Sequence, residues 1–128
     1  MNCLLDTHLL LWVADESDRL SPTARRLIED ETTSVSFSVA SIWEVSIKAS
    51  VRPIEFVADP RRLRRMLVDN GWIEIPITSE HAVAIRDLPP IHADPFDRML
   101  LAQAHVEGMT LLTSDAVVAQ YPGDVRKV

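Results

Sequence analysis

The chain opens with MNCLLDTHLLLWVA (residues 1–14), in which a short apolar run is followed, after Asp6 and Thr7, by a second one. The run at 2–5 has the length of a buried strand, and the leucine-rich run at 9–14 is predicted to form a short helix. A strand that leads directly into a helix is the repeating unit of a parallel sheet with helices on its faces. The rest of the chain repeats this unit.

Strand-like and helix-like segments alternate along the whole sequence. The expected strands are at residues 2–5, 34–39, 72–77, 110–113 and 124–128. The expected helices are at residues 9–14, 22–30, 41–50, 61–70, 79–88, 94–107 and 115–121. This order predicts a three-layer α/β fold, in which a central parallel sheet of about four to five strands carries helices on both faces.

Local signals support several of these boundaries. Three helices begin with an N-cap residue followed by proline, at Ser21-Pro22, Asp59-Pro60 and Asp94-Pro95. Two helices are followed by glycine, which favours the left-handed conformation that ends a helix, at Gly71 and Gly108. The alternation of serine with apolar residues at 34–39 predicts a strand that is half exposed or near an edge of the sheet.

The composition is typical of a folded protein. The 128 residues are 47% apolar and 25% charged, which excludes a disordered chain and suits a single domain over residues 1–128. The single cysteine, Cys3, excludes a disulfide framework and is expected to be a buried thiol in a reducing compartment. The first apolar stretch lacks a basic flank and is interrupted by Asp6, unlike a signal peptide or a membrane span. We expect a cytoplasmic protein without membrane contact.

Four acids lie near the starts of predicted helices, and helix capping could explain each of them. Asp6 and Asp115 follow strands, Glu44 is the fourth residue of the capping-box pattern SIWE, and Asp97 is an acid in the first turn of a helix. Taken singly, each acid is therefore better explained by capping than by chemistry.

The same four acids taken together favour chemistry. The carboxyl ends of parallel strands share one edge of a sheet, and ligand sites form in the crevice there. Carboxylates gathered at such an edge repel one another unless a cation lies among them. Oxygen ligands, without repeated cysteine or histidine, favour Mg²⁺ or Mn²⁺ over structural zinc. The formal net charge of −6 also disfavours nucleic-acid binding by bulk electrostatics alone, so a metal or a basic patch would have to attract it. The pattern predicts metal-dependent hydrolysis of a phosphodiester.

Four ordered segments, MNCLLDTHLLLW, SVASIWEVSIKAS, HADPFDRMLLAQA and LLTSD, resemble the PIN-domain ribonucleases, and among them the VapC-type toxins of toxin–antitoxin pairs. The resemblance covers nearly the whole chain. It implies a PIN-like fold, an endoribonuclease that uses Mg²⁺ or Mn²⁺, a homodimer, and a cognate VapB-like antitoxin that neutralises the enzyme. It also implies that Asp6, Glu44, Asp97 and Asp115 form the catalytic metal site.

Three further residues are candidates for the same site. Asp94 is an additional acid, for which a helix cap is favoured over contact with the metal because Asp97 is the better match. The hydroxyl of Thr7 could join the water shell of the metal, although a cap would explain it equally well. Arg98 could contact a phosphate or pair with Asp94. Asp115 lacks the second acid that often follows it in relatives, which favours a water-mediated contact with the metal.

The remaining aromatic and basic residues have plainer interpretations. His8, His92 and His105 are isolated in the sequence and are expected at the surface or in the core. The three tryptophans are expected in the core, because each lies in an apolar pattern: Trp12, Trp43 and Trp72. Lys48 is expected to pair with Glu44 one helical turn earlier. The apolar excess at residues 9–12 suggests an interface with a second copy or an antitoxin.

Two rival functions are separated from the nuclease by specific features. A receiver-type signalling domain also gathers acids around Mg²⁺, but it needs a lysine after a late strand, and Lys127 lies at the very end of the sequence. A protein-binding module whose acids are all caps would lose about 1 kcal/mol of stability per substituted cap, without any effect on metal binding. The sequence favours the metal-dependent endoribonuclease.

Overall fold

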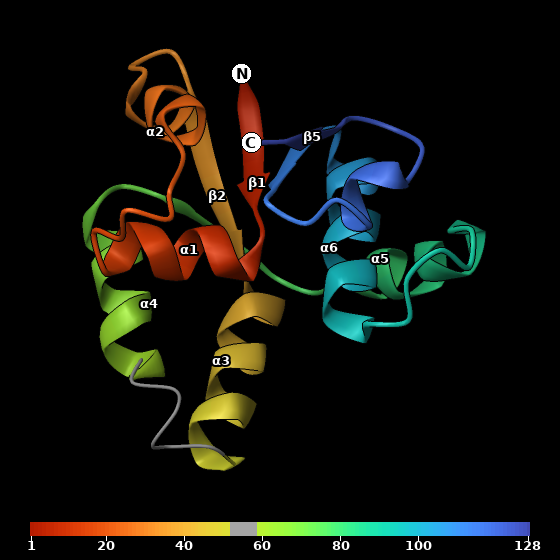
Figure 1. The fold of residues 1–128 in the computed structure, drawn as a ribbon. Coiled ribbons are helices and arrows are strands. Elements are labelled where there is room, and N and C mark those ends of the chain that lie inside the picture. The colour runs from red at the N-terminus through yellow and green to blue at the C-terminus, as the bar shows by residue number, and fades with distance from the viewer. Residues whose placement is uncertain (52–58) are drawn as a thin grey trace.

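The computed structural model describes residues 1–51 and 59–128. Within these ranges five strands form one sheet, every neighbouring pair is parallel, and the order is β3-β2-β1-β4-β5 (Figure 1). The strands are β1 (Asn2–Leu5), β2 (Ser34–Ser38), β3 (Ile73–Ile75), β4 (Thr110–Thr113) and β5 (Val125–Lys127). The helices are α1 (Thr7–Ala14), α2 (Pro22–Glu29), α3 (Val39–Val51), α4 (Pro60–Asp69), α5 (Ser79–Ala84) and α6 (Pro95–Glu107), with 3₁₀ turns η1 (Ile85–Asp87) and η2 (Val118–Gln120).

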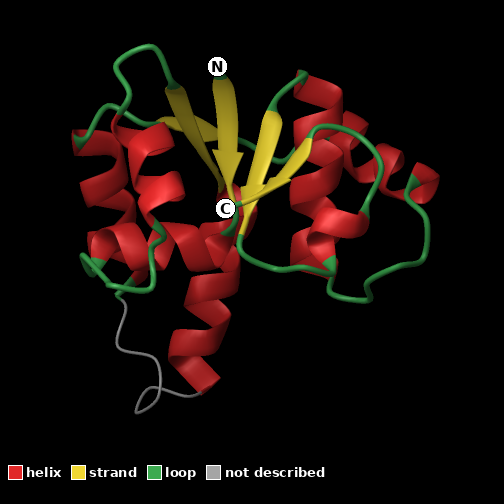
Figure 2. Ribbon diagram, turned by 45° about the horizontal axis from the view of Figure 1, so that its top comes forward, coloured by secondary structure: helices red, strands yellow, loops and turns green. Residues whose placement is uncertain are grey.

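Helices cover both faces of the sheet (Figure 2). Because successive side chains of a strand point to opposite faces, each central strand can pack against helices on both sides. Cys3 and Leu5 of β1 belong to the core cluster that includes α1, α2 and α4, whereas Leu4 packs with α6 and η2. The central strands are consequently buried on both faces. The predicted three-layer α/β fold is confirmed.

The predicted start and stop signals act as expected. The side chains of Ser21, Asp59 and Asp94 accept hydrogen bonds from backbone N–H groups at the starts of α2, α4 and α6, and proline follows each cap. At the end of α6, Gly108 has φ +66°, a conformation that side chains with a Cβ rarely adopt. Sequence patterns of this kind fix helix ends because they satisfy the N–H and C=O groups that the helix itself leaves free.

The second strand differs from its prediction. β2 lies between β1 and β3 rather than at an edge, and both Ser36 and Ser38 are buried. Small serine side chains can face a packed helix, and Ser38 does so by donating a hydrogen bond to Gln103 of α6. The alternation of polar and apolar residues was therefore misleading as a sign of exposure.

The helix that follows β2 begins earlier than expected. α3 starts at Val39, and the Ser38 hydroxyl accepts a hydrogen bond from the backbone N–H of Ala40 at 2.9 Å. Ser41 therefore lies inside the helix and does not form the expected capping box with Glu44. Near the C-terminus, the expected helix at 115–121 is only a turn followed by η2.

The apolar excess of the first helix is largely explained by the core. Leu9 and Leu10 are buried, and Leu11 and Trp12 pack against the same cluster. The prediction that all three tryptophans lie in the core is wrong for Trp43, which is 55% exposed. None of the helices in the described ranges combines the length and the apolar character that crossing a bilayer requires.

Ser36 and Ser38 allow a matched test of this packing, because both are buried on the same face of β2. The Ser36 hydroxyl has no hydrogen-bond partner among the described residues, whereas Ser38 binds both Gln103 and the start of α3. We expect Ser36→Ala to leave the free energy of unfolding unchanged or to raise it by up to about 1 kcal/mol, and Ser38→Ala to lower it by about 1 to 3 kcal/mol. Urea denaturation of both variants measures this difference, and equal losses would contradict the assignment.

Candidate metal centre

The four predicted acids gather at the carboxyl-terminal edge of the sheet. The strand arrows in Figure 1 point to this edge, where α1 and α3 begin. Asp6 directly follows β1, and Asp115 comes two residues after β4. Glu44 lies in the second turn of α3, and Asp97 lies in the first turn of α6. The parallel topology therefore brings together acids that are far apart in the sequence.

Asp6 is buried and joins three segments through its carboxylate. Its Oδ1 accepts a hydrogen bond from Leu9 N at 2.9 Å, which caps α1. Its Oδ2 accepts hydrogen bonds from Thr113 Oγ1 at 2.6 Å and from Ser114 N at 3.2 Å, both at the end of β4. Burial raises the pKa of Asp6, and these hydrogen bonds act in the opposite direction. Thr113 was not predicted as a site residue, because a threonine at the end of a strand has no distinctive sequence pattern.

Glu44 is only 5% exposed, and its two oxygens differ. Oε2 accepts from Lys48 Nζ at 2.6 Å, so the expected pairing one turn along the helix is confirmed. Oε1 is buried and has no hydrogen-bond partner in the described part of the chain. An unpaired buried carboxylate oxygen is costly, and a cation placed against it would remove that cost. This oxygen is the clearest sign that the residues present fit a bound metal ion.

Asp97, Asp115 and His92 form the tightest group. One potential ligand atom from each lies within 4.8 Å of the other two. His92 Nε2 is 2.9 Å from Asp97 Oδ2, and Asp115 Oδ1 accepts from the backbone N–H of Val117 at 2.7 Å. Within the described ranges only this group comes this close, so the structure brings two of the four acids within reach of one ion and places Asp6 and Glu44 around them.

His92 is a site residue that sequence reasoning missed. It was expected at the surface or in the core because no second ligand follows it at a regular spacing. The chain turns back between His92 and Asp97, and Tyr121 holds this turn: its hydroxyl accepts from His92 N at 2.7 Å and donates to His92 O at 3.1 Å. The only sequence signal is a histidine five residues ahead of a site acid, which is too common to be diagnostic.

The electrostatics of Asp97 reflect the gathering of acids. Its pKa is raised from 3.8 to about 6, first by burial and then by the negative charge of Asp94. The charges of Glu44 and Asp6 raise this pKa further, and the hydrogen bond with His92 lowers it. The carboxylates are therefore close enough to repel one another, as expected of a site that binds a cation.

Capping explains some of the acids but not all of them. Asp6, Asp94 and Asp115 each accept a hydrogen bond from a backbone N–H group at the start of a helix or turn. In the described part of the chain, the hydrogen bonds of Glu44 and Asp97 go instead to the side chains of Lys48 and His92. The interpretation that every acid is a cap therefore fails for these two residues.

The three remaining candidates lie near the site. Asp94 Oδ1 caps α6, as favoured from the sequence. Thr7 Oγ1 donates to Ser41 Oγ at 2.9 Å and ties α1 to α3, and its contact with a metal-bound water stays a prediction. Arg98 donates to the carbonyls of Ile85 and Pro89 and to the Tyr121 hydroxyl. This placement anchors the segment that carries His92, and the contact of Arg98 with a phosphate stays a prediction.

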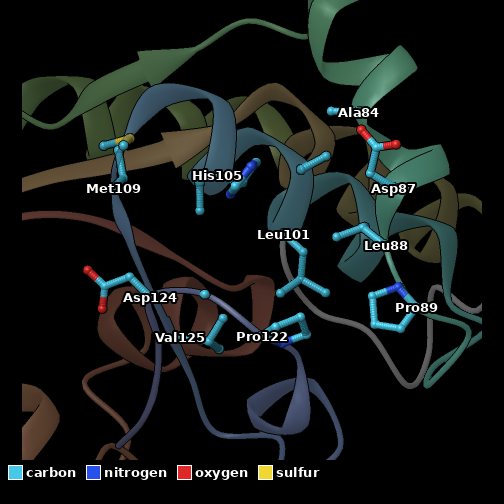
Figure 3. Close-up of a pocket in the computed structure, with 14 residues that line it drawn as sticks. Ala84, Asp87, Leu88, Pro89, Leu101, His105, Met109, Pro122, Asp124 and Val125 are labelled. Carbon is cyan, nitrogen blue, oxygen red and sulfur yellow. The ribbon is translucent and has the colours of Figure 1, made fainter.

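A hollow in the described part of the chain lies elsewhere. It has a volume of about 360 Å³ and lies between η1, α6 and the residues that lead into β5 (Figure 3). Leu88, Leu101 and Val125 contribute apolar surface, and Asp87 and Asp124 are its carboxylates. None of the predicted site residues lines this hollow, so the acids lie outside it.

Comparisons with known proteins identify the family and the fold of the chain. The model of the PIN domain family matches residues 3–124. A chain of VapBC2 from Rickettsia felis, solved bound to a DNA fragment from its promoter, has a TM-score of 0.75 at 12% identity, covering 100% of this chain and 99% of that one. A chain of a toxin-antitoxin complex from Klebsiella pneumoniae has a TM-score of 0.67 at 21% identity, covering 97% and 95%.

DNA-bound VapBC from Salmonella typhimurium also contains a chain of this fold, with a TM-score of 0.67 at 13% identity, covering 99% of this chain and 98% of that one. No curated protein gives a significant match. At these identities the solved structures establish a shared fold, and the family model, which spans nearly all of the sequence, establishes the family. The chain belongs to the PIN domain family.

Proposed function

We propose that this chain is a metal-dependent endoribonuclease, the toxin of a toxin–antitoxin pair, acting in the cytoplasm as a single-domain protein. The observation that carries the proposal is the unpaired, buried Oε1 of Glu44, located near the mutually repelling carboxylates of a PIN domain. Neither capping nor an ion pair accounts for that oxygen. A cation bound among the acids accounts for it.

The four acids have different parts in this proposal. Asp97 and Asp115 would hold Mg²⁺ or Mn²⁺ directly, with His92 within reach of the same ion. Glu44 would add negative charge from α3, and Asp6 would hold the ends of β1 and β4 together. A divalent ion bound there supplies charge neutralisation at the phosphate and lowers the pKa of an attacking water. Because the acids would serve as metal ligands and the ion would activate a water, we infer direct attack by that water without a covalent enzyme intermediate.

The proposed partners follow from the resemblance and from the complexes of similar fold. Two of those structures are VapBC proteins bound to DNA, and the third is a toxin-antitoxin complex. We infer that this chain forms a homodimer and that a cognate VapB-like antitoxin neutralises it. The receiver-type alternative is not favoured, because the chain matches the PIN domain family over residues 3–124.

Cleavage of RNA by the purified chain, freed of any partner, tests the proposed activity. We expect cleavage with Mg²⁺ or Mn²⁺ and none with a chelator, because the acids alone repel phosphate. Glu44→Gln and Asp97→Asn should each lower the rate by at least about 100-fold, since they remove charge that holds the ion. The control Asp87→Asn changes an exposed acid of η1 that is remote from the site and should cut like the parent. Cleavage that survives chelation, or full activity of Glu44→Gln, would contradict the proposal.

The raised pKa of Asp97 predicts how stability depends on pH in the absence of metal. The folded protein binds the proton of Asp97 more tightly than the unfolded chain does. Protonation of Asp97 therefore stabilises the fold fully below about pH 4, and this contribution is lost as the pH rises through about 6. The full shift corresponds to about 3 kcal/mol, an upper limit because the side chain is partly exposed to solvent. In chelator near pH 7.5, Asp97→Asn should therefore be more stable than the parent by about 1 to 2 kcal/mol.

Urea denaturation near pH 4 and near pH 7.5 measures this effect, with Asp87→Asn as the matched control. The advantage of Asp97→Asn should vanish at the lower pH. Added Mn²⁺ should stabilise the parent at the higher pH and have little effect on Asp97→Asn. If Asp97→Asn is instead less stable than the parent in chelator at the higher pH, His92 and its neighbours favour the charged carboxylate and the repulsion argument is wrong.

A further inference from the structure

Trp43 is the largest exposed apolar side chain near the acids. It precedes Glu44 on α3 and is 55% exposed, against the expectation that it belongs to the core. Its ring meets the ring of Phe96 edge-on, with the centroids 5.0 Å apart and the planes at 78°. Phe96 in turn precedes Asp97 on α6. The two helices that bring Glu44 and Asp97 together therefore also place an aromatic pair beside them.

We propose that Trp43 is the platform on which a base of the RNA stacks next to the phosphate that is cleaved. This inference rests on the proposed function and adds to it a residue that binds the substrate. The contact with Phe96 restrains the Trp43 ring, while more than half of the residue stays open to solvent. A restrained and accessible aromatic ring beside a phosphate site is the arrangement that single-stranded nucleic acids use for base stacking.

Electrostatics explain why such a platform would be needed. The chain carries a net charge of −6, and the site itself is built from carboxylates, so the surroundings repel the RNA backbone. Lys48, the cation nearest to Glu44 along α3, is already paired with that carboxylate. Stacking does not depend on charge and tolerates any base. It therefore supplies attraction to the RNA that does not depend on positive charge on the protein.

The same helix face offers a competing explanation. Ile47 and Val51 are also exposed and follow Trp43 at intervals of four residues, a pattern that would suit contact with another protein. Trp43 differs from them because its ring contacts Phe96 of α6 at the acids. Ile47 lies one turn further from that contact, on the same face of α3. It therefore provides the matched control for Trp43.

Binding of a short, fluorescently labelled single-stranded RNA tests the proposal. All proteins keep Asp97 and are measured with Ca²⁺ in place of Mg²⁺ or Mn²⁺, so that an ion with oxygen ligands can occupy the acids. Each is measured with the RNA and with an abasic ribose-phosphate chain of the same length, and the RNA is checked for cleavage after each titration. Trp43→Ala should weaken RNA binding by roughly 5- to 100-fold, Trp43→Phe should restore most of the loss, and Ile47→Ser should have little effect. The abasic chain has no base to stack, so it should bind equally well with or without Trp43. Comparing the two losses in a double-mutant cycle then assigns the loss of RNA binding to the base.

Several outcomes would overturn the proposal. Unchanged RNA binding by Trp43→Ala would do so, and so would an equal loss for the abasic chain, which would indicate a structural role. If Trp43→Ala and Ile47→Ser both change the mass measured by light scattering, and RNA binding falls with it, the face is a protein interface. Cleavage by the unmodified chain reports separately on the proposed function. If the unmodified chain cuts RNA but Trp43→Ala binds RNA as well as its parent, only this inference is refuted. If RNA binding depends on Trp43 but the unmodified chain does not cut RNA, the proposed nuclease activity is refuted.

Discussion

The carboxylate of Asp6 is buried where β1 passes into α1, and it accepts hydrogen bonds from α1 and from the end of β4. It caps α1 through Leu9 and holds the end of β4 through Thr113 and Ser114. Thr113 Oγ1 also accepts a hydrogen bond from Asp115 N at 3.0 Å, so the position of Asp115 depends on the same contact. A neutral side chain at position 6 would weaken this junction together with the site. Asp6 therefore serves the fold and the site at once, and the choice between cap and chemistry does not arise for it.

Glu44 and Asp97 differ from Asp6, because their carboxylates lie in surroundings that are unfavourable for the folded state. Glu44 has a buried oxygen without a partner, and Asp97 has a pKa raised by burial and by neighbouring acids. Proteins usually avoid such arrangements except where function requires them. Asp94 contrasts with them, because its carboxylate caps α6 and that role accounts for its position, whereas no cap accounts for Glu44 or Asp97.

The sequence predicted what depends on local chemistry. Caps followed by proline, glycine after a helix, and an acid after a buried strand act through the nearest few backbone groups, so the caps at Asp94 and Asp6 and the helix end at Gly108 are confirmed. Features that depend on distant segments were missed. Ser36 and Ser38 look like exposed positions until α6 covers them, and His92 joins the site only because Tyr121 holds the turn before α6. Trp43 looks like a core residue, since no local pattern indicates that α3 leaves that side uncovered.

We infer that the acids at the carboxyl-terminal edge of the sheet bind a divalent ion. Anomalous diffraction from crystals soaked in Mn²⁺ tests it most directly, because the ion is located without reference to activity. We expect a Mn²⁺ peak between the carboxylates of Asp97 and Asp115, with Glu44 Oε1 directed towards it. Saturating Mn²⁺ that leaves this edge empty, or that binds only at the hollow beside Asp87 and Asp124, would contradict it.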